Sequence, residues 1–245
     1  MCLAICAGFK IFALQQQQLS SLLFILAIIP GLAICYLIFR IDKYEREPLW
    51  ALAMCFFLGM LATIPAIGFQ YWSGVISGFK TQSAAITFIA SFGVVAASEE
   101  IAKCAALLIG AFPRKFFNEP VDGIVYAVLI GMGFATIENL IYAYNFGMNT
   151  TVARAFTAVP AHFVCAIVQG YFIGRAKFQP ERRIQLILLG LGLSIVMHGV
   201  YDFLILQELS AWLSVLGSIS VYICLFYCGT LVREHLENSP FKPVN

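Results

Sequence analysis

Polar and ionisable residues occur in four groups inside otherwise apolar stretches of this sequence. The groups are Ser98-Glu99-Glu100 with Lys103, Glu138-Asn139, His162, and His198 with Asp202. A charged side chain costs about 3 kcal/mol at the centre of a membrane span, so such residues are rare there and are usually functional. Carboxylates and imidazoles serve as general acids, general bases and metal ligands. We therefore expect these groups to form a chemically active site.

The spacing within the groups shows which side chains can meet on a helix. Lys103 follows Glu99 by four residues and Glu100 by three, so its ammonium group can reach either carboxylate. His198 and Asp202 are four residues apart and share a helix face, where the carboxylate can fix the imidazole tautomer or bind the same ligand. Adjacent glutamates point in different directions, so we expect at most one of the pair to face a common centre.

Each group taken alone also has a structural interpretation. Glu100 and Lys103 could form a buried ion pair, and Asn139 is expected to hydrogen-bond between helices rather than to catalyse. His162 alone would be an interfacial histidine, and Asp122 is expected to be a helix N-cap. The functional interpretation depends on the groups acting together.

The composition indicates where these groups must be positioned. The chain has 245 residues, of which 61% are hydrophobic and 11% are charged, whereas soluble domains carry roughly 25% charged residues. A helix needs about 20 apolar residues to cross a bilayer. Runs of this kind occur at 19–39, 49–69, 86–112, 121–146, 158–176, 184–206 and 209–232. We therefore predict an all-α polytopic transmembrane bundle with about seven spans.

No separate soluble domain is expected, because apolar residues are spread along the whole sequence. We predict one integral-membrane domain over residues 1–245, with an interfacial segment at 1–18 and a cytoplasmic tail at 233–245. Residues 147–157 are too polar and too short to span a bilayer, so we expect a re-entrant or surface segment there. The eight cysteines lie mostly in apolar runs, which favours packing roles over disulfides or a metal site.

Basic residues in the loops orient the predicted spans. Eleven fall on one side of a seven-span arrangement: Arg40, Lys43, Arg46, Arg114, Lys115, Arg175, Lys177, Arg182, Arg183, Arg233 and Lys242. Lys10, Lys80 and Arg154 fall on the other side. The positive-inside rule then predicts an outer N-terminus and a cytoplasmic C-terminus. In this orientation all four polar groups lie toward the outer half of the bilayer, which predicts a single polar cavity opening outward.

At these positions the sequence resembles the PrsW family of bacterial intramembrane proteases, which is related to the CAAX-processing protease superfamily. The resemblance covers nearly the whole chain, and no ionisable position departs from the pattern. The motifs are Tyr44-Glu-Arg-Glu-Pro48, Glu99-Glu100-x-x-Lys103, Asp122-Gly-Ile-Val-Tyr126, Gly133-Phe134-x-x-x-Glu138-Asn139, Arg154-x5-Pro160-x-His162 with Gly170-Tyr171, and His198-Gly-Val-Tyr-Asp202-Phe203.

The resemblance implies an endopeptidase of a bacterial cell membrane. Its substrates would be membrane-anchored proteins, such as anti-sigma-factor-like regulators, cleaved near the outer face; the bilayer is the other partner, and nucleic acid is not. By the superfamily pattern Glu99 would activate water, and Glu138 stands where CAAX proteases have a histidine. His198 and Asp202 stand at the histidine and asparagine positions that are thought to stabilise the oxyanion.

The sequence leaves the question of a metal open. A metal-free mechanism needs a carboxylate, a water molecule and oxyanion donors, whereas a zinc mechanism needs three protein ligands and an open position. His162, His198 and Glu138 could bind zinc or another divalent metal, although the HExxH signature is absent. The family is commonly described as metalloproteases, and Glu138 and Asp202 make this site more anionic than that of CAAX proteases, which favours a cation.

Two other classes of function use the same residues. A proton-coupled transporter or channel could relay protons through the buried carboxylates and histidines, but transporters usually contain inverted repeats, and we find no repeat in the sequence. A catalytically idle scaffold that retains membrane partners is the third hypothesis.

Overall fold

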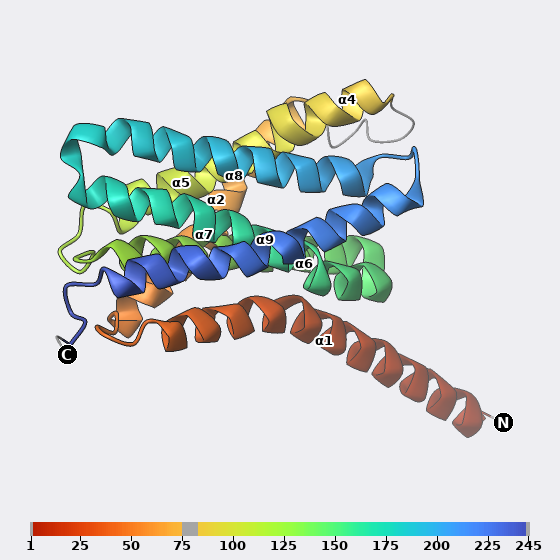
Figure 1. Ribbon diagram of the computed structural model, residues 1–245. Helices are drawn as coiled ribbons and strands as arrows, with labels where there is room; N and C mark the ends of the chain where they lie inside the picture. Colours follow the sequence, from red (N-terminus) through yellow and green to blue (C-terminus); the bar gives the residue numbers. More distant parts are fainter. Residues whose placement is uncertain (1, 75–82, 244–245) are drawn as a thin grey trace.

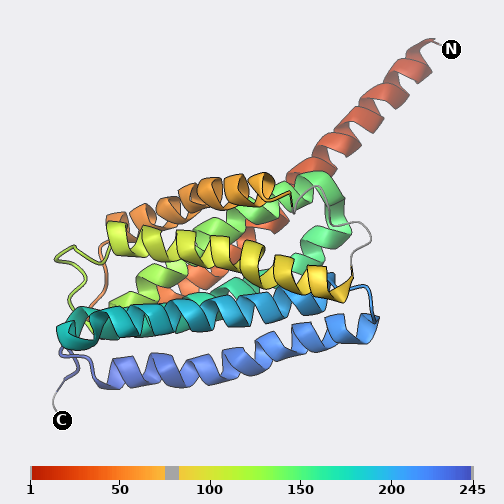
Figure 2. The same cartoon turned by 90° about the horizontal axis from the view of Figure 1, so that it is seen from above.

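The computed structural model describes residues 2–74 and 83–243, and every regular element in these ranges is helical. The elements are α1 (Cys2–Ile41), α2 (Leu49–Trp72), α4 (Ala84–Ile89), the π-helix η1 (Ala90–Ala96), α5 (Ala97–Gly110), α6 (Pro120–Phe156), α7 (Ala158–Phe178), the short 3₁₀-helix η2 (Pro180–Arg182), α8 (Arg183–Leu206) and α9 (Ala211–Glu237). The helices lie side by side in one elongated bundle (Figures 1 and 2). The predicted all-α class is confirmed.

Five stretches are long and apolar enough to cross a membrane: Ser21–Ile41, Leu49–Trp72, Pro120–Phe178, Pro180–Leu206 and Ala211–Glu237. The third stretch contains both α6 and α7. The continuous series α4, η1 and α5 carries the Glu99-Glu100 pair and Lys103, and it is not among the five. The helical membrane architecture is therefore supported, while the count of seven spans stays a prediction.

The two central helices of the bundle are α6 and α7. Almost every residue of Val121–Thr136 is buried, and so is most of α7, whereas α1, α2, α8 and α9 expose many large apolar side chains. An exposed apolar surface of this extent is expected of a protein in contact with lipid. Polar residues within the buried parts of α6 and α7 are consequently enclosed by the surrounding helices.

Glycine permits the close crossing of α6 and α7. A Cβ atom on Gly123 would collide with the carbonyl oxygen of Gly170, and one on Gly170 would collide with the carbonyl oxygen of Gly123. Small residues at a crossing let two helix backbones approach directly, which strengthens van der Waals packing in a membrane. This reciprocal contact fixes the relative position of the two central helices.

A π-helix precedes the first glutamate of the candidate site. The wider π turns of η1 end at Ala96, immediately before α5, and π-helical segments occur frequently at functional sites. A Cβ on Gly199 of α8 would lie 2.5 Å from the Phe92 ring of η1. The absence of a side chain at Gly199 therefore lets the residue next to His198 pack directly against this segment.

The segment predicted to be re-entrant or at the surface is the last part of α6. Gly147 interrupts the helix with φ 76° and ψ −161°, a conformation accessible essentially only to glycine. The helix then continues to Phe156 in a new direction, and Thr151 Oγ1 donates a hydrogen bond to the Gly147 carbonyl at 2.8 Å. This change of direction returns Arg154 toward the body of α6.

Both end segments of the chain begin or end within long helices. The backbone of residues 2–18, predicted to be an interfacial segment, is continuous with the following span in α1 and projects away from the bundle (Figures 1 and 2). At the other end, α9 continues through Arg233 to Glu237, so the helix extends into the predicted tail. The division of residues 1–245 into a single membrane domain with these two end segments stays a prediction.

Asp122 is not the N-cap that the sequence suggested. Glu119 is the N-cap of α6, and Asp122 is the third helical residue of a capping box. Asp122 Oδ2 accepts hydrogen bonds from the backbone N–H groups of Asn118 at 2.7 Å and Glu119 at 2.9 Å. Asp122 therefore satisfies the start of the helix from inside it, because Pro120 begins the helix one residue after Glu119.

Candidate active site

The ammonium group of Lys103 lies at the centre of the polar cluster. Glu99, Glu100 and Lys103 are all buried on α5. Lys103 Nζ donates to Glu100 Oε1 at 2.8 Å and to Glu99 Oε2 at 3.4 Å, as their spacing predicts. Its third contact is His162 Nδ1 at 3.0 Å. The lysine thus links the two carboxylates of α5 to a histidine of α7.

Both glutamates contact His198, so the expectation that at most one would face a common centre is wrong. His198 Nδ1 lies 2.8 Å from Glu100 Oε1, and His198 Nε2 lies 3.8 Å from Glu99 Oε2. The two glutamate side chains approach the imidazole ring from different directions. Each of them faces a different ring nitrogen. His198 therefore lies between the two carboxylates.

The hydrogen bond to Glu100 determines the tautomer of a neutral His198. A carboxylate only accepts hydrogen bonds, so Nδ1 must carry the proton. Nε2 then faces Glu99 and also Asp202, whose Oδ2 atom lies 3.4 Å away. Asp202 Oδ2 is buried and has no hydrogen-bond donor among the residues that the structure describes. Two carboxylate oxygens near one imidazole nitrogen form a negatively charged site that favours binding of a proton or a metal cation.

His162 connects this centre to Glu138 on α6. An ammonium group only donates, so His162 Nδ1 accepts from Lys103 and Nε2 carries the proton. Nε2 donates to Glu138 Oε2 at 2.8 Å. The rings of His162 and His198 meet edge to face, with centroids 5.1 Å apart. The structure therefore brings together the ionisable residues of all four groups inside the apolar stretches.

Arg154 neutralises Glu138, a contact that the sequence did not reveal. Arg154 Nη2 lies 2.8 Å from Glu138 Oε2, and Arg154 Nε donates to Asn139 Oδ1 at 2.8 Å. Asn139 Nδ2 in turn donates to the Ala27 carbonyl of α1 at 3.5 Å. Asn139 thus has the interhelical hydrogen-bonding position that was expected of it. The only sequence signal for Arg154 was its presence in the motif that ends at His162.

Two glutamines that donate hydrogen bonds to the site were also not predicted from the sequence. Gln70, near the end of α2, donates to Glu99 Oε1 at 3.2 Å and to Ser98 Oγ at 3.3 Å. Gln169 of α7 donates to the Glu100 carbonyl at 3.4 Å and to Ser194 Oγ of α8 at 3.1 Å. A glutamine within or beside an apolar run was the available signal for both residues.

Two groups of side chains have donor atoms close enough to bind a metal ion. In each group the donor atoms lie within 4.8 Å of one another; the groups are Glu99, His162 and His198, and Glu100, Cys165 and His198. Three protein ligands with a free fourth position are typical of catalytic zinc. The residues fit a divalent cation chemically, and the unpartnered Asp202 oxygen adds negative charge beside them. Glu138, a predicted ligand, is absent from both groups, and its metal-binding role stays a prediction.

Two of the motifs meet far from this cluster, at the other end of α6. The Tyr126 hydroxyl donates to Glu47 Oε2, and Asp122 lies one helical turn before Tyr126. Asp122 and Glu138 are 16 residues apart, or about 24 Å along the helix. Burial raises the pKa of Glu47 and of Glu119, and burial together with Glu119, Glu47 and Glu45 raises the pKa of Asp42 to about 7. This acidic group joins the starts of α2 and α6 and lies outside the candidate site.

Comparisons with known proteins agree with this geometry. Residues 47–230 match the model of the PrsW family intramembrane metalloproteases. Protease PrsW of Bacillus subtilis is 32% identical over 200 residues, which cover 81% of this chain and 89% of the relative. Protease PrsW of Clostridioides difficile is 34% identical over 192 residues, covering 76% and 80%. Protease PrsW of Oceanobacillus iheyensis is 32% identical over 212 residues, covering 86% and 95%. No solved structure matches.

These relatives are peptidases, so the transporter hypothesis is not favoured. The matched region contains every residue of the candidate site, from Gln70 to Asp202. The apolar helices agree with a membrane location, and the two groups of donor residues agree with a metal-dependent enzyme of unspecified metal. The chain therefore belongs to the PrsW family of intramembrane metalloproteases and is a membrane-embedded peptidase.

Proposed function

We propose that this protein is an endopeptidase that hydrolyses membrane-anchored proteins near the outer face of a bacterial membrane, with Glu99 as the base. The observation that supports this function is the buried cluster in which Glu99 Oε2 faces His198 Nε2 at 3.8 Å. Membrane-anchored regulators of the anti-sigma-factor type are the substrate class that we infer. The excess of basic residues in the loops on one side supports the outward orientation.

The hydrogen bonds distinguish the two glutamates. Glu100 Oε1 accepts short hydrogen bonds from Lys103 and His198, both at 2.8 Å, so this oxygen serves to position the two side chains. Glu99 has only longer contacts, with Gln70 at 3.2 Å and with Lys103 at 3.4 Å. A weakly held carboxylate is better able to accept a proton from water. We therefore assign the base to Glu99 and the orientation of His198 to Glu100.

Hydrolysis proceeds by attack of water on the carbonyl carbon of the scissile peptide bond. Glu99 accepts the proton of the water and delivers it to the departing amine nitrogen as the C–N bond breaks. Without a bound metal, a doubly protonated His198 would donate from Nε2 to the oxyanion, and Asp202, 3.4 Å from that nitrogen, would stabilise the imidazolium. Lys103 keeps both glutamates and His162 in place throughout.

His162, His198 and Glu138 would hold a divalent metal, which we infer to be zinc. When bound, such an ion polarises the substrate carbonyl and lowers the pKa of a bound water. Glu138 Oε2 is 2.8 Å from His162 Nε2, so binding through this nitrogen requires loss of its proton and a shift of the contact with Glu138. Glu99 lies within 4.8 Å of both histidines, which is suitable for a base acting on water beside the ion.

The proposal is tested with purified protein reconstituted in liposomes together with a single-span reporter substrate. Glu99→Gln should abolish cleavage, by roughly 10²-fold or more, while leaving the zinc content unchanged. His162→Ala and His198→Ala should lose both zinc and activity. Glu208→Gln, at an exposed carboxylate in the turn before α9, serves as the control. Full activity of Glu99→Gln would exclude it as the base, and loss of zinc in that variant would make it a ligand.

A further inference from the structure

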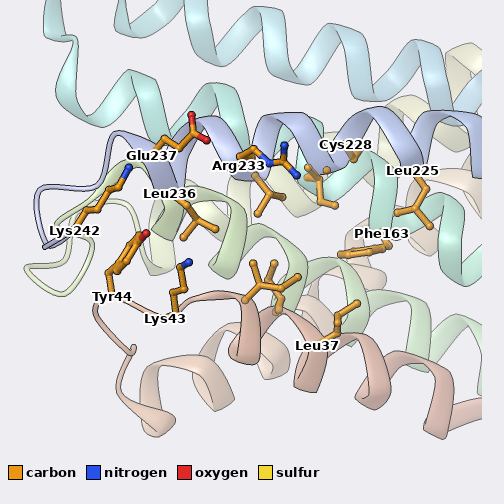
Figure 3. A pocket seen from close by; sticks show the side chains of 15 residues that line it. Leu37, Lys43, Tyr44, Phe163, Leu225, Cys228, Arg233, Leu236, Glu237 and Lys242 are labelled. Atoms are coloured by element: carbon orange, nitrogen blue, oxygen red, sulfur yellow. The ribbon is translucent and has the colours of Figure 1, made fainter. Parts of the chain in front are cut away.

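A groove of about 670 Å³ separates α1 from α9 at the end of the bundle where the C-terminus lies (Figures 1 and 3). This volume falls within the roughly 300–1,000 Å³ of small-molecule sites. The helices α1 and α9 scarcely touch each other directly, so the groove stays open between them. It borders the face of α7 that carries Phe163 and Ile167, beside the face on which Ala166 and Gly170 pack against α6. None of its lining residues belongs to the candidate active site.

The inner part of the groove is apolar. Leu37 of α1 and Leu225 and Val232 of α9 form its walls, and Phe163 and Ile167 of α7 form its floor. Both floor residues are buried beneath the groove. From Leu225 to Leu236 the wall of α9 extends about 16 Å at helical rise. An elongated apolar chain therefore fits the groove better than a compact polar ligand.

The outer end of the groove is basic. Lys43 and Lys242 line this end, and Arg233 lies one helical turn before Glu237 along α9. We call these three basic residues the basic mouth, and all three side chains are exposed. Figure 3 shows Lys43 and Lys242 at one end of the groove, with Tyr44 between them, and Phe163 and Leu225 farther along it. Glu237 is the only acidic residue of the lining. None of the three basic side chains forms a salt bridge with any residue that the structure describes, so their charge is available to a ligand.

We propose that this groove binds one anionic phospholipid, with an acyl chain along the apolar part and the phosphate at the basic mouth. Basic pockets between membrane helices attract anionic headgroups, and apolar walls exclude the headgroup from the inner part. A transmembrane helix of a partner would match the walls but would leave the three cations of the mouth without a counter-charge. Charge complementarity therefore favours a lipid.

The bound lipid would contact the helix that carries a site residue. Phe163 directly follows His162 in α7, and its ring forms part of the groove floor. An acyl chain packed on Phe163 and Ile167 would support the face of α7 that borders the groove between α1 and α9. The lipid would then help to hold His162 in position without contacting the reacting groups.

The headgroup contact is tested by native mass spectrometry of the detergent-solubilised full chain, titrated with phosphatidylglycerol or phosphatidylcholine. We expect one tightly retained phosphatidylglycerol, with phosphatidylcholine binding on the order of tenfold more weakly. The double variant Lys43→Gln/Arg233→Gln should remove this preference. Lys115→Gln/Arg182→Gln removes two exposed basic residues outside the groove, and it should keep the preference.

The acyl-chain contact is tested by filling the groove. Gly229 lines it, and a Cβ at this position would meet no atom within 4 Å, so Gly229→Leu projects into the groove without disturbing the fold. Gly192→Leu is the matched control, because Gly192 is equally open but lies on α8 outside the groove. Retention of phosphatidylglycerol should fall at least tenfold in Gly229→Leu and stay unchanged in Gly192→Leu.

Three results would overturn the proposal. Equal retention of the two lipids by the wild-type protein would indicate only the general lipid annulus. Loss of retention in the charge variant but not in Gly229→Leu would locate the lipid on the surface rather than in the groove. A dimer that dissociates in Gly229→Leu would assign the groove to a second copy of the chain.

Discussion

The two ring nitrogens of His198 contact different partners, and this division separates the roles of two adjacent glutamates. Nδ1 is held by Glu100 at 2.8 Å, whereas Nε2 faces Glu99 at 3.8 Å and Asp202 at 3.4 Å. A carboxylate bound to one nitrogen of an imidazole orients the ring and strengthens the other nitrogen as a ligand. Glu100 therefore orients the imidazole of His198 through Nδ1, whereas Glu99 faces Nε2, although the two glutamates are adjacent in the helix.

Glu100→Gln should weaken metal binding by roughly 10- to 100-fold, because the neutral amide no longer supports the basicity of His198. Titration with zinc in the presence of a competing chelator measures this change, and the pH profile of peptide cleavage should shift with it. Glu100→Asp should restore part of the affinity, since it keeps the charge. Unchanged zinc affinity in Glu100→Gln would show that Glu100 does not act through His198.

Lys103→Met should destabilise the folded protein by about 3 kcal/mol, because it leaves two buried carboxylates and a histidine nitrogen without their donor. Thermal unfolding in detergent should show a lowered Tm. Lys115→Met, at an exposed lysine in the loop after α5, should change the stability by no more than about 0.5 kcal/mol. Equal Tm values for the two variants would contradict the central position of Lys103.

At the scale of elements, the break in α6 completes the site. The helix passes Glu138, changes direction at Gly147 and returns Arg154 to within 2.8 Å of Glu138. The π-helix η1 is a second irregular segment, and it ends at Ala96, three residues before Glu99. Irregular backbone at membrane depth requires burial within protein, and at both places it borders the candidate site.

Gly147→Ala should cost about 1–3 kcal/mol, because an alanine is strained at φ 76° and ψ −161°. Relief of the strain would move Arg154 away from Glu138, so peptide cleavage should fall together with the Tm. Gly68→Ala is the control, because Gly68 lies inside the regular helix α2 and a Cβ there would meet no atom within 4 Å. A fully active and stable Gly147→Ala variant would argue against this role of the break.

The acidic group that joins α2 to α6 predicts a pH-dependent stability. The pKa of Asp42 is raised to about 7 in the folded protein, chiefly by burial, whereas the unfolded value is about 4. Between these two values the folded state binds more protons than the unfolded state, so stability falls as the pH rises. Asp42→Asn should therefore raise the free energy of unfolding at pH 8 by about 1 kcal/mol and have little effect near pH 4.

Unfolding of both proteins in detergent at several pH values measures this difference. Glu181→Gln, at an exposed carboxylate in η2, should retain the pH dependence of the wild-type protein. Parallel stability curves for the wild-type protein and Asp42→Asn would show that Asp42 does not titrate in this range.

Across the whole molecule, apolar side chains and ionisable side chains occupy different places in the bundle. The exposed apolar side chains of α1, α2, α8 and α9 face outward from the bundle, whereas the ionisable cluster is enclosed by the helices. The basic mouth of the groove and the acidic group at Asp42 both occur near the ends of helices; the three basic side chains are exposed there, whereas Asp42 is buried.

The predicted orientation can be checked with reporter fusions in a bacterial host. Green fluorescent protein fused after Asn245 should fluoresce, because the positive-inside rule predicts a cytoplasmic C-terminus. Alkaline phosphatase fused at the same position should be inactive, since it requires an oxidising outer compartment. The opposite pair of results would reverse the orientation and would direct the candidate site toward the cytoplasm.

Local spacing and composition were sufficient to predict several features of this protein. Apolar runs of sufficient length predicted helices in a membrane, because the backbone must satisfy its hydrogen bonds within each span. The i,i+3 and i,i+4 spacings predicted the contacts of Lys103 and the pairing of His198 with Asp202, because these depend on one helix only. The cost of intramembrane charge singled out the candidate residues.

Contacts between residues of different helices could not be predicted from these local patterns. The convergence of Glu99 and Glu100 on His198 depends on how closely α8 approaches α5 and η1, which glycine at position 199 permits. The return of Arg154 to Glu138 depends on a backbone break at Gly147, and the contact of Gln70 with Glu99 joins α2 to α5. Residues distant in sequence meet according to helix crossings and backbone direction, and neither is encoded in the spacing along a single helix.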